Sequence, residues 1–116
     1  MKLNGLDIKP NFFTKKGNKV LKNAFEKTSV KARKNENNLE NAIISKEKYQ
    51  EKEVKIIKKF FESILTEKDA KKLFETCLNY QDYHDVFEKF VKILILSGTL
   101  SNIIKKVKKR TKKWIF

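Results

Sequence analysis

Apolar residues along this chain recur mostly at spacings of three and four, which places side chains on one stripe of an α-helix. The first stripe follows Asn18, a residue type that caps helices, and predicts a helix reaching about Lys34. Its members are Val20, Leu21, Ala24, Phe25, Thr28 and Ala32. The next residues read KNENN and contain no apolar side chain, so they predict a polar loop.

A second stripe predicts one long helix with a candidate break near Ser45. It starts at Leu39, Ala42 and Ile43, and it resumes after the polar stretch SKEKYQEKE. The resumed members are Val54, Ile57, Phe60, Phe61, Ile64 and Leu65.

Two polar pairs mark later helix starts. Thr66 with Asp69 resembles a capping box with a shorter acid and predicts a short helix. That helix carries Ala70, Leu73, Phe74, Cys77 and Leu78. The segment 79–82 supplies the next cap, and the clearest stripe of the chain follows it: Tyr83, Val86, Phe87, Phe90, Val91 and Leu94. Gly98 is placed to end that helix, and Ser101 to cap a final one.

The opening MKLNGLDI predicts a β-hairpin. Asn4-Gly5 is the dipeptide that best accepts the positive φ angles of a type I′ turn. A lone two-stranded hairpin is only marginally stable in water, so Leu3, Leu6 and Ile8 are expected to pack on the helices.

Together these elements predict an all-α fold, a small bundle of four to five helices with a short N-terminal β-hairpin. A chain of 116 residues is one ordinary domain's length. We divide it into the hairpin (1–9), a helical core (18–98) and a basic C-terminal helix or tail (99–116). At 40% hydrophobic residues it can bury a modest core.

The formal net charge of +14 is concentrated at the two ends. Residues 1–38 hold ten Lys/Arg against three acids, residues 39–98 eleven against eleven, and residues 99–116 seven against none. Such a distribution suits a polyanionic partner, namely nucleic acid, an anionic membrane or an acidic protein. The competing explanation is an A+T-rich genome, because 26 lysines accompany two arginines and ten asparagines. Scarce Arg also argues against base readout.

No enzymatic motif is present, so we expect a protein that is not an enzyme and needs no cofactor or metal. The single Cys77 falls on an apolar stripe and predicts a packed thiol in a reducing compartment. His84 has acids nearby in sequence and predicts an exposed or half-buried helix position. No apolar run approaches the ~20 residues of a membrane span, so a soluble, cytoplasmic protein is expected.

The C-terminal segment is the candidate site for a partner. As a helix it is amphipathic and ends in Trp114, Ile115 and Phe116. It could bind a nucleic-acid backbone, lie on an anionic membrane, dock in a partner groove, or simply present lysines to water. The candidate contact residues for a partner or polyanion are Lys105, Lys106, Lys108, Lys109, Arg110, Lys112, Lys113 and Trp114.

Residues 55–92, KIIKKFFESILTEKDAKKLFETCLNYQDYHDVFEKFVK, resemble a segment of tail assembly chaperones of siphophages infecting low-G+C bacteria. Shared features are a helix ending in a double Phe, a short turn, an A-K-K-hydrophobic-F helix and an F-x-x-F ending. The openings MKLNGLDI and NKVLKNAFEKTSVKARK are also similar, so the likeness covers about four fifths of the chain. Two features depart from the pattern: the turn before A-K-K lacks the usual Gly, and the ending is basic.

The resemblance implies a small helical, non-enzymatic assembly protein that coats the tape measure protein before the tail tube polymerises. It implies that the apolar helices at 54–65 and 83–94 provide the core and surfaces for self-association, so a homo-oligomer is expected. The alternative is a small basic phage inhibitor of host defence (anti-CRISPR-like), or a nucleic-acid-binding protein, acting on a host nucleoprotein complex. Nucleic acid would then be bound through the basic ends.

Overall fold

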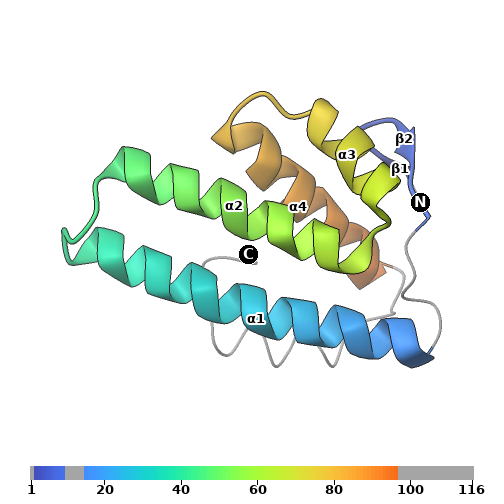
Figure 1. The fold of residues 1–116 in the computed structure, drawn as a ribbon, viewed down its shortest axis with the longest axis horizontal. Helices are drawn as coiled ribbons and strands as arrows, with labels where there is room; N and C mark the ends of the chain where they lie inside the picture. The colour runs from blue at the N-terminus through green and yellow to red at the C-terminus, as the bar shows by residue number, and fades with distance from the viewer. Residues whose placement is uncertain (1, 10–14, 97–116) are drawn as a thin grey trace.

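The structure, a computed structural model, describes residues 2–9 and 15–96. In chain order its elements are strands β1 (Lys2–Leu3) and β2 (Leu6–Asp7) and helices α1 (Lys15–Glu40), α2 (Lys46–Ile64), α3 (Glu67–Glu75) and α4 (Tyr80–Leu96) (Figure 1). The predicted fold class, a small helical bundle with an N-terminal hairpin, is confirmed. The predicted end at Gly98 and the final helix after Ser101 lie outside the described residues.

Helix α2 is the centre of the arrangement. α1 packs along one side of it as an antiparallel neighbour, and α3 and α4 pack on the other (Figure 1). The hairpin lies beside α3 and against α4. The core therefore forms where α2 meets α1 and α4.

The core is built on five fully buried phenylalanines, contributed by three helices. They are Phe25 of α1, Phe60 and Phe61 of α2, and Phe87 and Phe90 of α4. The Phe60 ring centroid lies 4.9 Å from that of Phe25, 5.0 Å from that of Phe87 and 5.7 Å from that of Phe90. The predicted stripes of α2 and α4 are confirmed as core faces.

Helix α1 is longer than the sequence predicted. It begins at Lys15, before the predicted cap at Asn18, and continues to Glu40 through the segment predicted as a polar loop. The reason is that Asn35 extends the inward stripe beyond Ala32, since this polar residue is buried with hydrogen-bond partners on α2. The prediction of a loop at KNENN was therefore wrong.

The connection between α1 and α2 replaces the predicted helix start at Leu39, Ala42 and Ile43. Ala42 has a φ of 56°, and its N–H donates to Leu39 O while the Ile43 N–H donates to Asn38 O. This is the Schellman arrangement that ends a helix, with alanine in the left-handed position usually held by glycine. α2 then starts at the predicted break, with Ser45 Oγ accepting from the Lys48 N–H.

Ala42→Gly should raise the free energy of unfolding by about 0.5–1 kcal/mol, because glycine adopts a positive φ without the steric cost that a Cβ incurs. Urea denaturation of the two proteins would measure the difference. A loss of stability, as expected for glycine inside a helix, would contradict the left-handed assignment.

The later caps and the hairpin turn follow the prediction. Thr66 Oγ1 accepts from the Asp69 N–H, and Asn79 Oδ1 accepts from the Asp82 N–H. Asn4 and Gly5 both have positive φ, as a type I′ turn requires. The side chain of Asn4 donates to Thr76 Oγ1 and accepts from Lys89 Nζ, which ties the hairpin to α4 and to the end of α3.

Three large predicted stripe members, Ile43, Leu78 and Val20, are exposed and lie outside the core. Leu78 is 89% exposed because α3 ends at Glu75 and Leu78 lies in the following turn, where its N–H donates to Asp82 Oδ2. Val20, near the start of α1, is 41% exposed. The remaining members of the α1 stripe are buried.

Candidate anion-binding groove between the first two helices

A groove of about 330 Å³ runs between α1 and α2, and its lining is strongly basic. The lining residues are Lys31, Lys34, Asn35 and Asn38 from α1 and Lys52, Lys55, Ile56 and Lys59 from α2. We call this feature the lysine groove. Five of its eight lining residues are lysines and none is acidic.

Helical spacing explains why these lysines meet. Lys31 and Lys34 are three residues apart on α1, and Lys52, Lys55 and Lys59 are three and four apart on α2, so each set shares one helix face. Antiparallel packing of α1 and α2 brings the two faces to opposite rims of one depression. The result is a concentrated positive potential.

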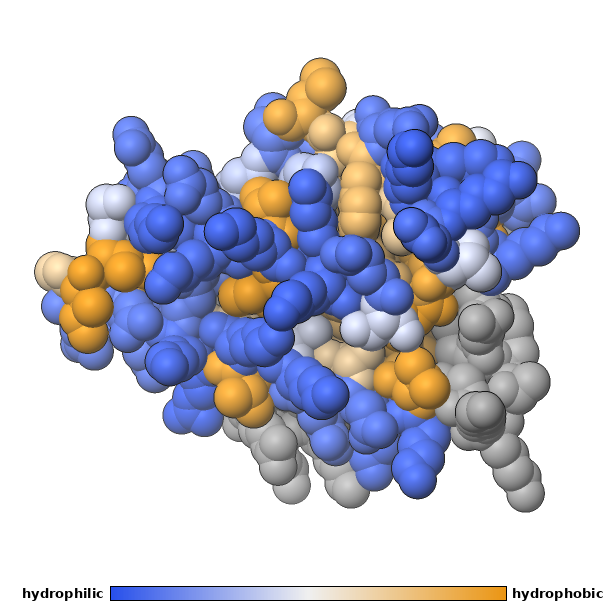
Figure 2. Space-filling view, viewed as in Figure 1, coloured by the Kyte–Doolittle hydropathy of each residue, from blue (hydrophilic) through white to orange (hydrophobic). Residues whose placement is uncertain are grey.

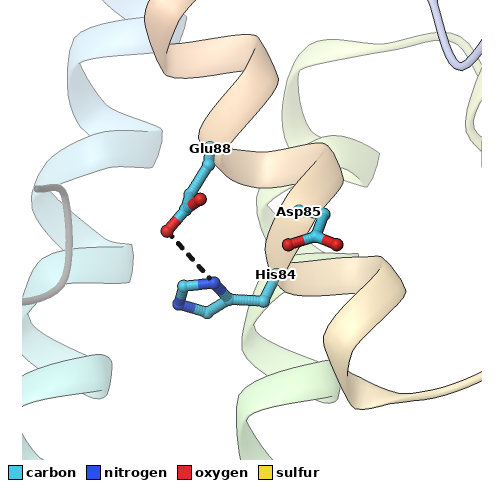
Figure 3. Close-up of side chains that lie close together, drawn as sticks. All are labelled: His84, Asp85 and Glu88. Carbon is cyan, nitrogen blue, oxygen red and sulfur yellow. Dashed lines mark ion pairs between the residues drawn. The ribbon is translucent and has the colours of Figure 1, made fainter.

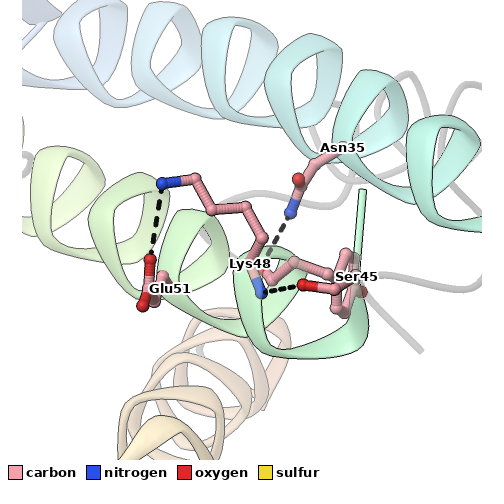
Figure 4. Close-up of polar contacts among 5 residues, drawn as sticks. Asn35, Ser45, Lys48 and Glu51 are labelled. Atoms are coloured by element: carbon pink, nitrogen blue, oxygen red, sulfur yellow. Dashed lines mark hydrogen bonds and ion pairs between the residues drawn. The ribbon is translucent and has the colours of Figure 1, made fainter. Parts of the chain in front are cut away.

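Ion pairing within the described part of the chain does not reduce this positive potential. None of the five groove lysines forms an ion pair with another residue in the described part of the chain. Lys48, which lies on α2 outside the groove, is different, because its Nζ lies 3.5 Å from Glu51 Oε2 (Figure 4). The charges of the groove lysines are therefore available to a partner.

The floor of the groove is formed by Asn35 and Ile56. Asn35 is 4% exposed, and its Nδ2 donates to Tyr49 O and to Glu53 Oε1, both at 3.1 Å. Figure 4 shows the Asn35 side chain extending from α1 toward the start of α2. Because both partners are acceptors, the amide orientation is fixed, and Asn35 Oδ1 is left buried without a hydrogen-bond partner.

Beneath the floor lies a buried polar cluster that joins three helices. Glu53 is fully buried, and its negative charge lies close to Tyr49 of α2 and Tyr80 of α4. Burial, followed by the charge of Glu53, raises the pKa of both tyrosines above the ordinary value. Both tyrosines therefore stay protonated at neutral pH, and the cluster is a structural support for the groove.

His84, Asp85 and Glu88 form a second group of titratable side chains, on α4 (Figure 3). His84 Nδ1 lies 3.4 Å from Glu88 Oε1, and the His84 side chain is 23% exposed, which matches the expected half-buried position. The pair spans one helical turn. All three residues belong to one helix, and no described residue of another helix joins them as a ligand.

Cys77 is buried and lies 3.7 Å from Leu73 O and 3.8 Å from Thr76 Oγ1. Burial raises the pKa of its thiol, so little thiolate forms at neutral pH. The prediction of a packed thiol is confirmed.

The structure does not place the predicted contact residues of the C-terminal segment. All eight of them lie outside the described residues: Lys105, Lys106, Lys108, Lys109, Arg110, Lys112, Lys113 and Trp114. The sequence analysis missed the lysine groove, although the spacing of the lysines at 52, 55 and 59 was a readable signal of a basic helix face.

Exposed apolar side chains are few in the described part of the chain. The large ones are Val20, Val30, Ile43 and Leu78. Figure 2 shows hydrophilic side chains over most of the face in view, with apolar side chains at the end where the α1–α2 loop lies and in separate small groups elsewhere on that face. The apolar stripes of α2 and α4, which the resemblance assigns to the core, are buried within the chain. Self-association through these helices stays a prediction. No described helix is long and apolar enough to span a membrane.

Comparison with known proteins gives no relative: no family model matches the chain, and no curated protein and no solved structure matches it.

Proposed function

We propose that this chain is a non-enzymatic phage assembly protein of the kind that tail assembly chaperones represent, and that it binds a partner protein, the tape measure protein. The supporting observation is the position in the core of the phenylalanines that carry the resemblance. The double Phe (Phe60, Phe61) and the F-x-x-F pair (Phe87, Phe90) pack together in one core, with ring centroids 5.0–6.4 Å apart. The likeness therefore concerns residues that pack together.

These motif residues are buried, so they cannot themselves contact a partner. A partner has to use the outer surface, where the lysine groove brings together five lysines that form no ion pair within the described part of the chain. The proposal accordingly places partner binding on α1 and α2 and assigns no catalytic step to any residue.

Affinity purification of the tagged chain from a bacterial host that carries the phage genes tests the proposal. Mass spectrometry of the co-purifying proteins should identify a long coiled-coil tail protein, and its recovery should survive nuclease treatment and moderate salt. Recovery of a nuclease complex that is lost on digestion would contradict the proposal.

The second candidate is the small basic inhibitor or nucleic-acid binder that acts on a nucleoprotein complex. The observation in its favour is the net charge of +14, with seven Lys/Arg and no acid in the sequence of residues 99–116. Binding through phosphates would weaken steeply as the salt concentration rises, because the release of counterions from the nucleic acid then gains less entropy.

Replacing Lys105, Lys106, Lys108, Lys109 and Arg110 with Ala should abolish polyanion binding under this second candidate and leave the helix content unchanged. Gel-shift assays and circular dichroism measure the two quantities. Unaltered binding would remove the C-terminal segment from the binding surface.

A further inference from the structure

We propose that the lysine groove binds an acidic segment of a partner protein, with carboxylates against the lysines on both rims and one apolar side chain against Ile56. The inference rests on the proposed function, because it names the chemistry of the partner that such a protein would hold. It goes beyond that function, which already places partner binding on α1 and α2, by stating the charge and the apolar contact of the segment that is bound.

Charge selects an anionic occupant. The rims carry five lysines from two helices, with no carboxylate in the lining. The four acids of α2 are placed elsewhere. Glu51 pairs with Lys48, Glu53 is buried beneath the floor, and Glu62 lines a different groove. Glu47 lies in the first turn of α2 and does not line the lysine groove. A row of carboxylates would therefore meet attraction along the whole groove and no repulsion from its lining.

The size of the groove and the apolar residue on its floor favour a protein segment as the occupant. A volume of about 330 Å³ holds a few side chains, as expected for one peptide segment lying between the two rims. Ile56 is a partly buried hydrophobic residue packed against the core, and it offers an apolar contact between the lysine rows. An amphipathic acidic segment matches this combination of apolar centre and basic rims.

The same lining disfavours nucleic acid. Proteins that bind single strands combine a basic groove with aromatic side chains on which bases stack. The lysine groove contains no aromatic residue and no arginine, so bases would find neither a stacking surface nor a bidentate donor. A nucleic acid would be held by its phosphates alone, and Ile56 would have no role.

The test compares two triple variants that remove equal charge. The groove variant removes the three lysines of the α2 rim through Lys52→Gln, Lys55→Gln and Lys59→Gln. The control variant removes three lysines of α3 and α4 that do not line the groove, through Lys68→Gln, Lys72→Gln and Lys92→Gln. The probe is a short fluorescein-labelled peptide of Glu and Leu with the Leu residues on one helical face. Fluorescence anisotropy should give about tenfold weaker binding for the groove variant and less than about twofold for the control.

Two further measurements separate the competing occupants. A peptide with Gln in place of Glu should not bind, and an unlabelled single-stranded oligonucleotide should compete poorly with the acidic peptide. Equal losses for the two triple variants, or an oligonucleotide that binds more tightly than the peptide and displaces it, would overturn the inference. Unchanged thermal melting of both variants establishes that they are folded.

The failure of this inference can be told apart from the failure of the proposed function. If the tape measure protein co-purifies equally well with the wild-type chain and with the groove variant, the function stands and the groove is excluded as its contact surface. If no partner protein is recovered but the acidic peptide still binds in the groove, the proposed function fails while the groove assignment stands.

Discussion

Phe60→Ala should lower the free energy of unfolding by about 3–5 kcal/mol, the cost of removing a phenyl ring from a closed core. Phe60 is 1% exposed, and its ring lies against rings from α1, α2 and α4. Deleting it removes the apolar contact that these three helices share and leaves a cavity among rigid neighbouring rings. Urea denaturation at constant temperature measures the loss.

The matched control is Phe74→Ala, which deletes the same atoms from a partly buried position on α3. The Phe74 ring is only partly buried against the core. It also contacts the flexible side chain of Lys58, whose Nζ lies 5.7 Å from the ring centroid. Its substitution should cost less than half as much as Phe60→Ala. Equal losses would show that Phe60 is not the centre of the core.

Asn35→Ala should lower the free energy of unfolding by about 2–3 kcal/mol, which is a large effect for an amide. The substitution removes both hydrogen bonds of Asn35 Nδ2, one to Tyr49 O and one to the buried carboxylate of Glu53. A buried acceptor that loses a donor loses part of the compensation for its desolvation cost. The gain in helix propensity offsets only a few tenths of a kcal/mol.

Asn37→Ala is the control for this prediction, since Asn37 is exposed two residues further along α1. Its substitution should be neutral or slightly stabilising. A double-mutant cycle of Asn35→Ala with Glu53→Ala should give a coupling of at least about 1 kcal/mol, because the two side chains are in direct contact. Additive effects would mean that the Asn35–Glu53 bond contributes nothing to stability.

The features that the sequence predicted correctly are those that depend on residues close together in the chain. Local signals were reliable: the Asn4-Gly5 turn, the caps at Thr66 and Asn79, and the apolar stripes of α2 and α4 all occur as predicted. Each depends on interactions between residues that are close in the chain, so the pattern itself carries the information.

The end of α1 is a feature that the local sequence pattern did not predict. KNENN contains no apolar residue, yet it is helical, because buried Asn35 finds its partners on α2, 14 and 18 residues away. A polar residue can occupy an inward position when its hydrogen bonds are satisfied there, and a sequence does not show which distant acceptors will be present. Ala42 likewise takes a backbone conformation that its residue type disfavours, because packing of the α1–α2 pair requires a sharp turn.

The sequence by itself determined the fold class, the position of the hairpin, the composition of the aromatic core and the excess of positive charge. Only the tertiary structure decided how that charge is distributed. Residues 39–98 are neutral by count, but burial of Glu53 and the pairing of Glu51 with Lys48 leave the rim of α2 basic, and Lys31 and Lys34 of α1 complete the groove across from it. The physical reason is that helical periodicity fixes which residues share a face, whereas only the packing of helices fixes which faces meet.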